Sequence, residues 1–481
     1  MSLDPLGATT LTTLQNALPA ACFKPIEPRY LEEPRGFFRG VAGAVLAPDN
    51  VQDVAKIVKI CNQNRVGIVP YGGGTGLVSG QVLPEGPAPV VLSLERLNKI
   101  REVALGDNVI VAEAGVILAS LQAKAAQHDR LFPLSLASEG SCQIGGNLAT
   151  NAGGIGVLRY GNARDLCLGL EAVLPDGTIW HGLKHLRKDN TGYDLKNLLI
   201  GSEGSLGIIT AAALKLFARP RVMVSTFLCV KDPTAALRLL EMFQAELGGM
   251  ISAFELIHRQ GLEFLDEKLP AIRQPFAAPS EWMVLADISV GISVGIPVGG
   301  GNDLTSGLET LLARAMEQGL VSDALISQNE AQRQEFWTLR ETIPEANRLI
   351  GAINSHDISV PISRIPELIT RGEALVAAFG DLRINCFGHL GDGNLHYNVY
   401  PPKGRNRDDF SHLRAGIKDA IYGLVDQLGG SISAEHGIGR LKLEDLQKYG
   451  DPAKLAAMRA IKSALDPNGI MNPGAVVCRP W

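Results

Sequence analysis

The 481-residue sequence has no excess of positive charge and no paired cysteines. Its 45 Lys and Arg residues are outnumbered by 50 Asp and Glu residues, which gives a net charge of -5. This balance excludes the broad basic surface that nucleic-acid binding requires, although it leaves room for a local positive pocket for an anionic substrate. The seven cysteines contain no Cys-x-x-Cys pair, which argues against a disulfide framework and is typical of a reducing compartment.

The chain also lacks a recognisable secretory leader and a long uninterrupted apolar run. The N-terminus carries Asp4 and no basic segment ahead of an apolar stretch, so we expect no signal peptide. The most apolar window, residues 282–300, contains Asp287, Pro297 and several glycines. It predicts a core strand that runs into a loop, and no transmembrane segment. We therefore expect a cytoplasmic protein.

What the chain has in quantity is length, apolar residues and glycine. A length of 481 residues is too great for one hydrophobic core, so two or three domains are expected. Hydrophobic content of 46%, charged content of 20% and 53 glycines describe a soluble globular protein with many turns and close backbone approaches.

Three of the nine histidines fall in two short glycine-rich segments, residues 386–398 and 433–439. The glycines in Gly391-Asp392-Gly393-Asn394 disfavour a helix and predict a strand, a turn and a second strand. His389 and His396 then lie at turn-bridged strand ends. The second segment offers both a carboxylate, Glu435, and another imidazole, His436, as a third ligand. Two imidazoles and one carboxylate with an open position are typical of a catalytic zinc or related divalent site. The simpler alternative for each residue is a hydrogen-bonded core histidine.

A β-α-β unit is predicted near the N-terminus. Residues 43–48 predict a strand, Asn50 can cap a helix that extends to Cys61, and residues 67–70 predict the next strand. This unit leads into a loop with four glycines, residues 70–77, where consecutive backbone N–H groups can face an anion such as a diphosphate. The loop fits neither the Gly-x-Gly-x-x-Gly pattern nor the Walker pattern, which argues against an NAD-type Rossmann fold and a P-loop.

Two more glycine clusters follow, at residues 140–154 and 200–210. So many small residues in the first of them indicate that something large and flat lies against the backbone, and Asn147, Thr150 and Asn151 can hydrogen-bond the edge of a ring. A flavin fits this description. Between the clusters, residues 170–179 predict a hairpin with Asp-Gly at its tip.

The three glycine segments, in this order, resemble the FAD-binding domain of the vanillyl-alcohol oxidase/p-cresol methylhydroxylase (PCMH) flavoprotein superfamily. The segments around His389–Asn398 and Glu435–His436 resemble its D-2-hydroxyacid dehydrogenase branch, which includes D-lactate dehydrogenase, the glycolate oxidase D subunit and D-2-hydroxyglutarate dehydrogenase. The resemblance implies an α+β fold with a two-part PCMH-type FAD-binding domain and an α+β substrate-binding cap domain. The expected parts are an N-terminal arm (1–35), the FAD-binding domain (36–218), the substrate domain (219–430) and a C-terminal segment (431–481) that returns to the FAD domain.

The resemblance also implies non-covalent FAD, because the first loop has no His or Cys and Cys142 beside the second is expected to be a packing residue. The FAD-binding positions carried over from the family are Pro70, Gly72, Gly73, Gly74, Thr75, Gly76, Leu77, Ser138, Gly140, Gly145, Gly146, Asn147, Thr150, Asn151, Ala152, Gly153, Gly154, Glu203, Gly207, Ile208, Ile209 and Asn472.

For catalysis, the resemblance implies a divalent metal, expected to be zinc, held by His389, His396 and Glu435. His436 would take the hydroxyl proton of a 2-hydroxy acid, and hydride would pass to the flavin. Arg340 would pair with the substrate carboxylate and Asn398 would orient the substrate. The electron acceptor is left open among an electron-transfer flavoprotein, a quinone and dioxygen, and the oligomeric state is also left open, with a homodimer as one candidate.

Two positions depart from the hydroxyglutarate pattern. Pro344 and Ser355 stand where those enzymes have Thr and Lys, so a second carboxylate on the substrate is left open, with His356 as a partial substitute. Two alternatives also stay open: a metal-independent FAD alcohol oxidase or dehydrogenase of the same fold, and a flavin-free metal-dependent hydrolase.

Overall fold

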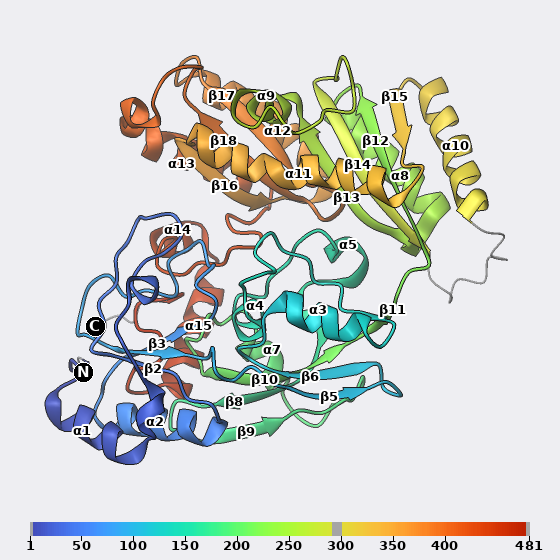
Figure 1. The fold of residues 1–481 in the computed structure, drawn as a ribbon. Coiled ribbons are helices and arrows are strands. Elements are labelled where there is room, and N and C mark those ends of the chain that lie inside the picture. The colour runs from blue at the N-terminus through green and yellow to red at the C-terminus, as the bar shows by residue number, and fades with distance from the viewer. Residues whose placement is uncertain (1–2, 291–300, 478–481) are drawn as a thin grey trace. The chain divides into compact units, whose positions relative to one another are not determined.

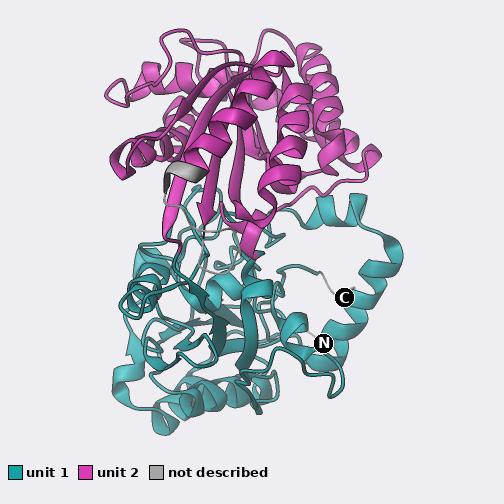
Figure 2. Cartoon of the chain, turned by 90° about the vertical axis from the view of Figure 1, so that its right-hand side faces the viewer, with its two compact units in different colours: residues 1–154, 161–219, 435–481 teal, residues 155–160, 220–434 magenta. Residues whose placement is uncertain are grey.

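A computed structural model describes residues 3–290 and 301–477 of the chain (Figure 1). The chain forms two compact units, each built from separate stretches of sequence (Figure 2). Unit 1 contains Met1–Gly154, Gly161–Arg219 and Glu435–Trp481. Unit 2 contains Ile155–Tyr160 and Pro220–Ala434. No helix in the described part of the chain is long and apolar enough to span a bilayer.

The predicted β-α-β unit is confirmed in unit 1. Strands β2 (Ala44–Leu46), β4 (Val90–Ser93) and β3 (Ile68–Tyr71) pair in parallel, and β1 (Phe23–Lys24) joins β2 antiparallel. Helix α2 (Val51–Gln63) connects β2 to β3 and begins at Asn50, whose side chain accepts a hydrogen bond from the Asp53 N–H at 2.9 Å.

A second sheet in unit 1 is antiparallel, with strand order β5-β6-β10-β8-β9. Its strands are β5 (Ile100–Ala104), β6 (Val109–Glu113), β10 (Ile208–Lys215), β8 (Cys167–Val173) and β9 (Ile179–Gly182). Strands β8 and β9 form the predicted hairpin. The other elements of unit 1 are α1 (Ala8–Ala17), α3 (Leu118–Ala126), β7 (Arg130–Leu131), α4 (Ile144–Ala149), α6 (Ala163–Leu166), α7 (Leu195–Leu199), β11 (Phe217–Ala218), α14 (Leu443–Tyr449) and α15 (Pro452–Leu465).

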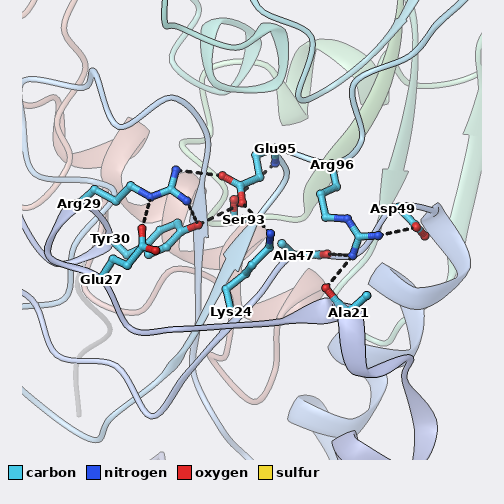
Figure 3. Close-up of polar contacts among 10 residues, drawn as sticks. All are labelled: Ala21, Lys24, Glu27, Arg29, Tyr30, Ala47, Asp49, Ser93, Glu95 and Arg96. Atoms are coloured by element: carbon cyan, nitrogen blue, oxygen red, sulfur yellow. Dashed lines mark hydrogen bonds and ion pairs between the residues drawn. The ribbon is translucent and has the colours of Figure 1, made fainter.

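Polar contacts hold the N-terminal residues of unit 1 against the end of β4 (Figure 3). Arg29 forms an ion pair with Glu95 at 3.1 Å, and Arg96 donates hydrogen bonds to the carbonyls of Ala21 at 2.8 Å and Ala47 at 3.0 Å. The hydroxyl of Tyr71, at the end of β3, donates to the Arg29 carbonyl at 2.6 Å. The N-terminal segment is thus tied to the strand that leads into the first glycine loop.

The C-terminal segment of unit 1 adds to the same sheet. Ile68 of β3 forms a parallel bridge with Met471, after the chain has passed through α15. Lys462 of α15 is buried and donates to Asp466, to the Ser205 carbonyl and to the Met471 carbonyl, at 2.6–2.7 Å. These bonds satisfy a buried ammonium group and fix the path of residues 466–472.

Unit 2 is built on a seven-stranded antiparallel sheet with strand order β15-β12-β14-β13-β17-β18-β16. Its strands are β12 (Val222–Val230), β13 (Ile251–His258), β14 (Trp282–Val290), β15 (Val321–Ile326), β16 (Asn354–Ser359), β17 (Arg383–His389) and β18 (Asn394–Tyr400). Strand β14 confirms the strand predicted in the apolar window; the loop predicted after it, residues 291–300, lies outside the described residues.

Helices cover both faces of this sheet. Helix α12 (Ile365–Ala377) contacts α8 (Pro233–Leu247) and α13 (Arg414–Gln427), which in turn contact the sheet, while α9 (Arg259–Lys268) packs on α11 (Glu330–Ile350). Helix α10 (Gly301–Glu317) contacts β15 and α8. The short helix α5 (Val157–Tyr160) packs on β13, and its Arg159 donates to the Ser289 carbonyl at 2.6 Å. The mixture of helices and sheets in the two units confirms the predicted α+β class.

Candidate active site

A groove in unit 1 runs past all three predicted glycine segments. The space between its walls amounts to about 950 Å³, including the part open to solvent. Predicted FAD-binding positions that line it are Pro70, Gly72, Gly73, Gly74, Thr75, Gly76, Gly145, Gly146, Asn147, Thr150, Glu203, Gly207, Ile208, Ile209 and Asn472. The predicted base, His436, lines it as well.

The first glycine loop explains why side chains are excluded here. A Cβ atom at Gly73 would collide with the carbonyl oxygen of Ser141, and one at Gly74 would collide with the Tyr71 hydroxyl. Gly74 also has a φ of +71°, which favours glycine. At Gly73 the loop backbone is therefore packed against the second glycine segment with no room for a Cβ atom.

The second glycine segment enters α4, which supplies one wall of the groove. A Cβ at Gly145 would lie 2.6 Å from the Cβ of Ala114, whereas one at Gly146 would meet no atom within 4 Å. Oε1 of Gln143 and Oδ1 of Asn147 are buried in the groove wall, and neither has a hydrogen-bond partner among the described residues. Buried acceptor oxygens of this kind require a donor, so this wall fits a group that carries N–H or O–H donors, such as the ring or the sugar hydroxyls of FAD.

A third wall comes from Glu203 and the C-terminal segment. Glu203 accepts hydrogen bonds from the backbone N–H groups of Ile438 at 2.8 Å and Gly439 at 2.9 Å. Burial raises the pKa of Glu203 to about 7, although these two bonds and nearby Arg440 act in the opposite direction. Asn472 donates to the carbonyls of Gly80 at 3.0 Å and Glu203 at 2.7 Å. The segment that carries His436 is thus fixed to the groove wall.

The remaining predicted positions are not among the residues that line the groove. They are Leu77, Ser138, Gly140, Asn151, Ala152, Gly153 and Gly154. Asn151, for example, accepts a hydrogen bond from the Arg164 N–H at 3.0 Å. Lining residues that the sequence reasoning missed include Tyr71, Gln81, Ala114 and Gln143. Gln143 sits inside the second glycine segment and Tyr71 inside the first glycine loop, so both lay within predicted segments; Gln81 and Ala114 come into the groove only through the folding of the chain.

Unit 2 contains the predicted histidine pair. The strand, turn and strand are confirmed as β17, a short 3₁₀ turn (Leu390–Asp392) and β18, and Gly393 after the turn has a φ of +87°. The rings of His389 and His396 have centroids 5.7 Å apart. Nδ1 of His389 lies 2.6 Å from Oε1 of Glu255, and Nδ1 of His396 lies 3.9 Å from Oδ1 of Asp357.

A carboxylate beside Nδ1 is what metal-binding histidines commonly have, because it orients the ring and leaves Nε2 for the ion. His389 has this arrangement, and His396 has a carboxylate within ion-pair distance of Nδ1, so the pair fits a divalent metal. The register also puts Asp357 opposite His396 and Ser355 opposite Asn398. Asn398 therefore shares a face of the sheet with His396, as predicted from the strand alternation.

Arg340, the predicted substrate-carboxylate residue, lies on α11 and is buried. Its Nε and Nη2 donate to Oε2 of Glu255 at 2.9 Å and 2.7 Å, and its guanidinium lies over the Phe387 ring at 5.0 Å. Burial tends to raise the pKa of Glu255, but its contacts with His389 and Arg340 lower it to about 2. Glu255 was missed in the sequence, although a glutamate inside an apolar strand was a signal.

The expected role of His356 is not supported. Because neighbouring residues in a strand point to opposite faces, His356 is directed away from the face that carries Ser355 and Asp357. Its ring packs edge-on against Tyr422 of α13 with centroids 5.3 Å apart. It is therefore not placed to substitute for the missing lysine beside Asn398.

The predicted third ligand, Glu435, is assigned to unit 1, where its Oε1 accepts a hydrogen bond from the Gly154 N–H at 3.1 Å. The preceding residue, Ala434, belongs to unit 2, and its N–H donates to the Asp357 carbonyl at 3.3 Å. The predicted ligand set is thus divided between the units, with His389 and His396 in unit 2.

Comparisons with known proteins agree with the groove and its glycine segments. Residues 42–182 match the FAD binding domain family, and residues 219–476 match the C-terminal domain of FAD linked oxidases. The chain is 36% identical to the mitochondrial D-2-hydroxyglutarate dehydrogenase of Arabidopsis thaliana, over 92% of this chain and 76% of that protein. It is also 36% identical to the D-2-hydroxyglutarate dehydrogenase of Xanthomonas citri pv. viticola, over 96% of both chains.

Among solved structures, p-cresol methylhydroxylase with substrate bound superposes with a TM-score of 0.76 at 16% identity, over 98% of each chain. At this identity the similarity shows the fold alone, and it confirms the predicted PCMH-type architecture. Together with the matched families, these relatives show that the chain belongs to the FAD-linked oxidases, in the group that contains the D-2-hydroxyglutarate dehydrogenases.

Proposed function

We propose that this protein oxidises a D-2-hydroxy acid to the corresponding 2-oxo acid, with FAD as the hydride acceptor and a divalent metal, expected to be zinc, as an aid. The observation that carries the proposal is the pair of imidazoles in unit 2, each with a carboxylate beside Nδ1. The glycine-lined groove and the names of the relatives support the flavin and the substrate class. In this proposal residues 36–218 and 431–481 bind FAD, and residues 219–430 bind the substrate.

Oxidation of R–CH(OH)–COO⁻ removes the hydroxyl proton and, from the α-carbon, a hydride. When bound, FAD takes up the hydride with its two electrons. His389, His396 and Glu435 would hold the metal, which supplies Lewis-acid polarisation of a hydroxyl. The Ala434 N–H is bonded to the carbonyl of Asp357, which lies on β16. Strand β16 pairs with β18, which carries His396. Glu435 therefore directly follows a residue that is bonded to the strand beside that of His396.

The chain's own residues take the other roles. A ring nitrogen of His436 accepts the hydroxyl proton, since a neutral imidazole carries a basic nitrogen. The guanidinium of Arg340 binds the substrate carboxylate through the donors that Glu255 does not use. Asn398 orients the substrate from the face that it shares with His396.

The substrate's side chain is the least constrained part of the proposal. The relatives' names favour D-2-hydroxyglutarate, while Pro344 and Ser355 provide no positive charge for a second carboxylate. Lactate-like or larger apolar 2-hydroxy acids are therefore included in the proposal. An electron-transfer flavoprotein or quinone as electron acceptor, and a homodimer, stay predictions.

The test is anaerobic reduction of the bound flavin, followed by loss of absorbance at ~450 nm, with a panel of D- and L-2-hydroxy acids. We expect bleaching by a D-acid and not by its L-enantiomer, loss of bleaching after treatment with EDTA, and recovery when Zn²⁺ is restored. Bleaching that survives complete metal removal would instead support the metal-independent alcohol oxidase or dehydrogenase. Purified protein without a flavin spectrum would overturn the proposal.

A further inference from the structure

Glu255 is a buried carboxylate whose two oxygens are used by two different partners. It lies in the middle of β13, in the apolar sequence Phe254-Glu255-Leu256, and is 1% exposed. A charge in such a place is costly unless each lone pair has a partner. In unit 2 both oxygens are satisfied: Oε1 by Nδ1 of His389 and Oε2 by Nε and Nη2 of Arg340.

The bond to His389 selects one tautomer of the imidazole. A carboxylate only accepts hydrogen bonds, so Nδ1 of His389 carries a proton, and in the neutral ring the lone pair is then on Nε2. The pairing of β13 with β17 enforces this contact, because Glu255 lies directly opposite His389 in the register. His389 is therefore presented to a cation with the correct nitrogen before any ion binds.

The bonds to Arg340 fix the second partner. Nε and Nη2 lie on one edge of the guanidinium, and both point to Oε2, so the end of the group formed by Nη1 and Nη2 keeps donors for another carboxylate. The Phe387 ring, at 5.0 Å, supports the guanidinium plane from β17. One carboxylate thus sets the orientation of both the imidazole and the guanidinium.

We propose that Glu255 is a positioning residue that holds the metal-binding edge of His389 and the carboxylate-binding edge of Arg340 in one fixed geometry. A 2-hydroxy acid offers a hydroxyl and a carboxylate on adjacent carbons, so a site that receives both groups needs its two receptors at a fixed spacing. The inference rests on the proposed metal-assisted function and assigns to Glu255 a role that neither the sequence motifs nor the relatives' names specify.

A second carboxylate in unit 2 provides a matched control. Asp287 of β14 is also buried and pairs with an arginine of α11, Arg333, with Nη1 3.5 Å from Oδ1. Its Oδ1 also accepts hydrogen bonds from Ser225 at 2.5 Å and Trp337 at 3.3 Å. Asp287 lies in the same sheet as Glu255 and also contacts α11, but none of these contacts of Asp287 involves His389 or His396.

The test compares the affinity of the full-length, FAD-bound protein for Zn²⁺ in the wild type, Glu255→Gln and Asp287→Asn, by competition with a chromophoric chelator. Removing a partner of this kind commonly weakens metal binding by about 10–100-fold, and we expect Glu255→Gln to raise the Zn²⁺ dissociation constant by that factor. Asp287→Asn should leave it within roughly twofold of the wild type, because it does not touch a ligand. An equal affinity in Glu255→Gln and the wild type would overturn the inference.

A measurement on the wild type keeps the inference testable if Glu255→Gln does not fold. In protein labelled with ¹⁵N-histidine, we expect the His389 ring, assigned by its loss in His389→Gln, to show the Nδ1–H tautomer before metal is added. The Nε2–H tautomer would overturn the role of Glu255 while leaving the proposed oxidation intact. Absence of Zn²⁺ binding in the wild type is a different result: it would overturn the metal-assisted function and, with it, this inference.

Discussion

Nη2 of Arg440 donates a hydrogen bond to Oδ1 of Asn472 at 2.7 Å, which joins two parts of the C-terminal segment at the wall of the groove. The same guanidinium donates to the carbonyls of Ser79 at 3.1 Å, Gly80 at 2.8 Å and Pro473 at 2.8 Å. Burial lowers the pKa of Arg440 to about 10, so it stays charged at neutral pH. The Arg440 side chain therefore connects Asn472 and Pro473 to Ser79 and Gly80, which follow the first glycine loop.

Replacing Arg440 with Met should weaken FAD binding. The substitution leaves several buried acceptors without donors, each at a cost of about 1–3 kcal/mol, so we expect at least a roughly tenfold rise in the FAD dissociation constant. The control is Arg96→Met, which also removes hydrogen bonds to two carbonyls, but away from the groove lining (Figure 3). Equal FAD affinities in the two variants, measured by fluorescence on flavin release, would contradict the prediction.

Two glycines of the groove should respond differently to alanine. At Gly146 a Cβ meets no protein atom within 4 Å and would project from a groove-lining helix position. Gly146→Ala should therefore reduce FAD affinity while the apoprotein keeps or gains stability, since alanine favours a helix by about 1 kcal/mol. At Gly73 a Cβ collides with the Ser141 carbonyl, so Gly73→Ala should lower both FAD affinity and apoprotein stability. Thermal unfolding with and without FAD separates the two cases.

Unit 2 should lose stability in mild acid through His258. Nδ1 of His258 accepts a hydrogen bond from the Gln260 N–H at 3.3 Å at the start of α9, and burial lowers the pKa of the ring to about 4 despite nearby Glu281. Because the unfolded chain binds the proton near pH 6.5 and the folded chain does not until about pH 4, the free energy of unfolding falls as the pH drops through this interval. The fall is on the order of 3 kcal/mol, since one pKa unit is about 1.4 kcal/mol.

The variant His258→Asn keeps a capping acceptor without a titrating group. Its free energy of unfolding, measured by urea denaturation at several pH values, should depend less steeply on pH than that of the wild type between about pH 4 and pH 6.5. Parallel curves for the two proteins would refute this assignment.

Removing Arg340 should destabilise unit 2 more than removing an exposed arginine of the same helix. Arg340→Met leaves the buried Glu255 carboxylate without its guanidinium partner, and the expected loss is about 3–5 kcal/mol in the free energy of unfolding. Combining it with Glu255→Gln should recover part of this loss, because the buried charge is removed. Arg348→Met, which breaks an exposed pair with Glu345, should change stability little in the same urea titration.

Local sequence patterns predicted the elements that depend on neighbouring residues. Asn50 precedes apolar residues with helical spacing and so predicted where α2 begins. The glycines on either side of Asp392 predicted the turn between β17 and β18. The glycine segments indicated where a flat ligand meets the backbone, because only glycine allows the close approach seen at Gly73. These features are encoded within a few residues of the chain.

Contacts made by distant strands were not predictable in the same way. Glu255 and His389 are 134 residues apart, and only the pairing of β13 with β17 brings them together. Arg440 likewise acquires its role from carbonyls more than 300 residues earlier in the chain, such as that of Ser79. The assignment of Ile155–Tyr160 to unit 2 depends on the packing of α5 on β13, for which the local sequence contains no marker.

The bridge between Ile68 and Met471 has a consequence for biosynthesis. Ile68 donates to the Ile470 carbonyl at 2.7 Å and accepts from the Asn472 N–H at 2.8 Å, so the strand that enters the first glycine loop gains these partners from residues translated long after it. While the ribosome is still making unit 2, that strand is without them. We therefore expect the nascent chain to bind FAD only after residues 470–472 have emerged from the ribosomal exit tunnel.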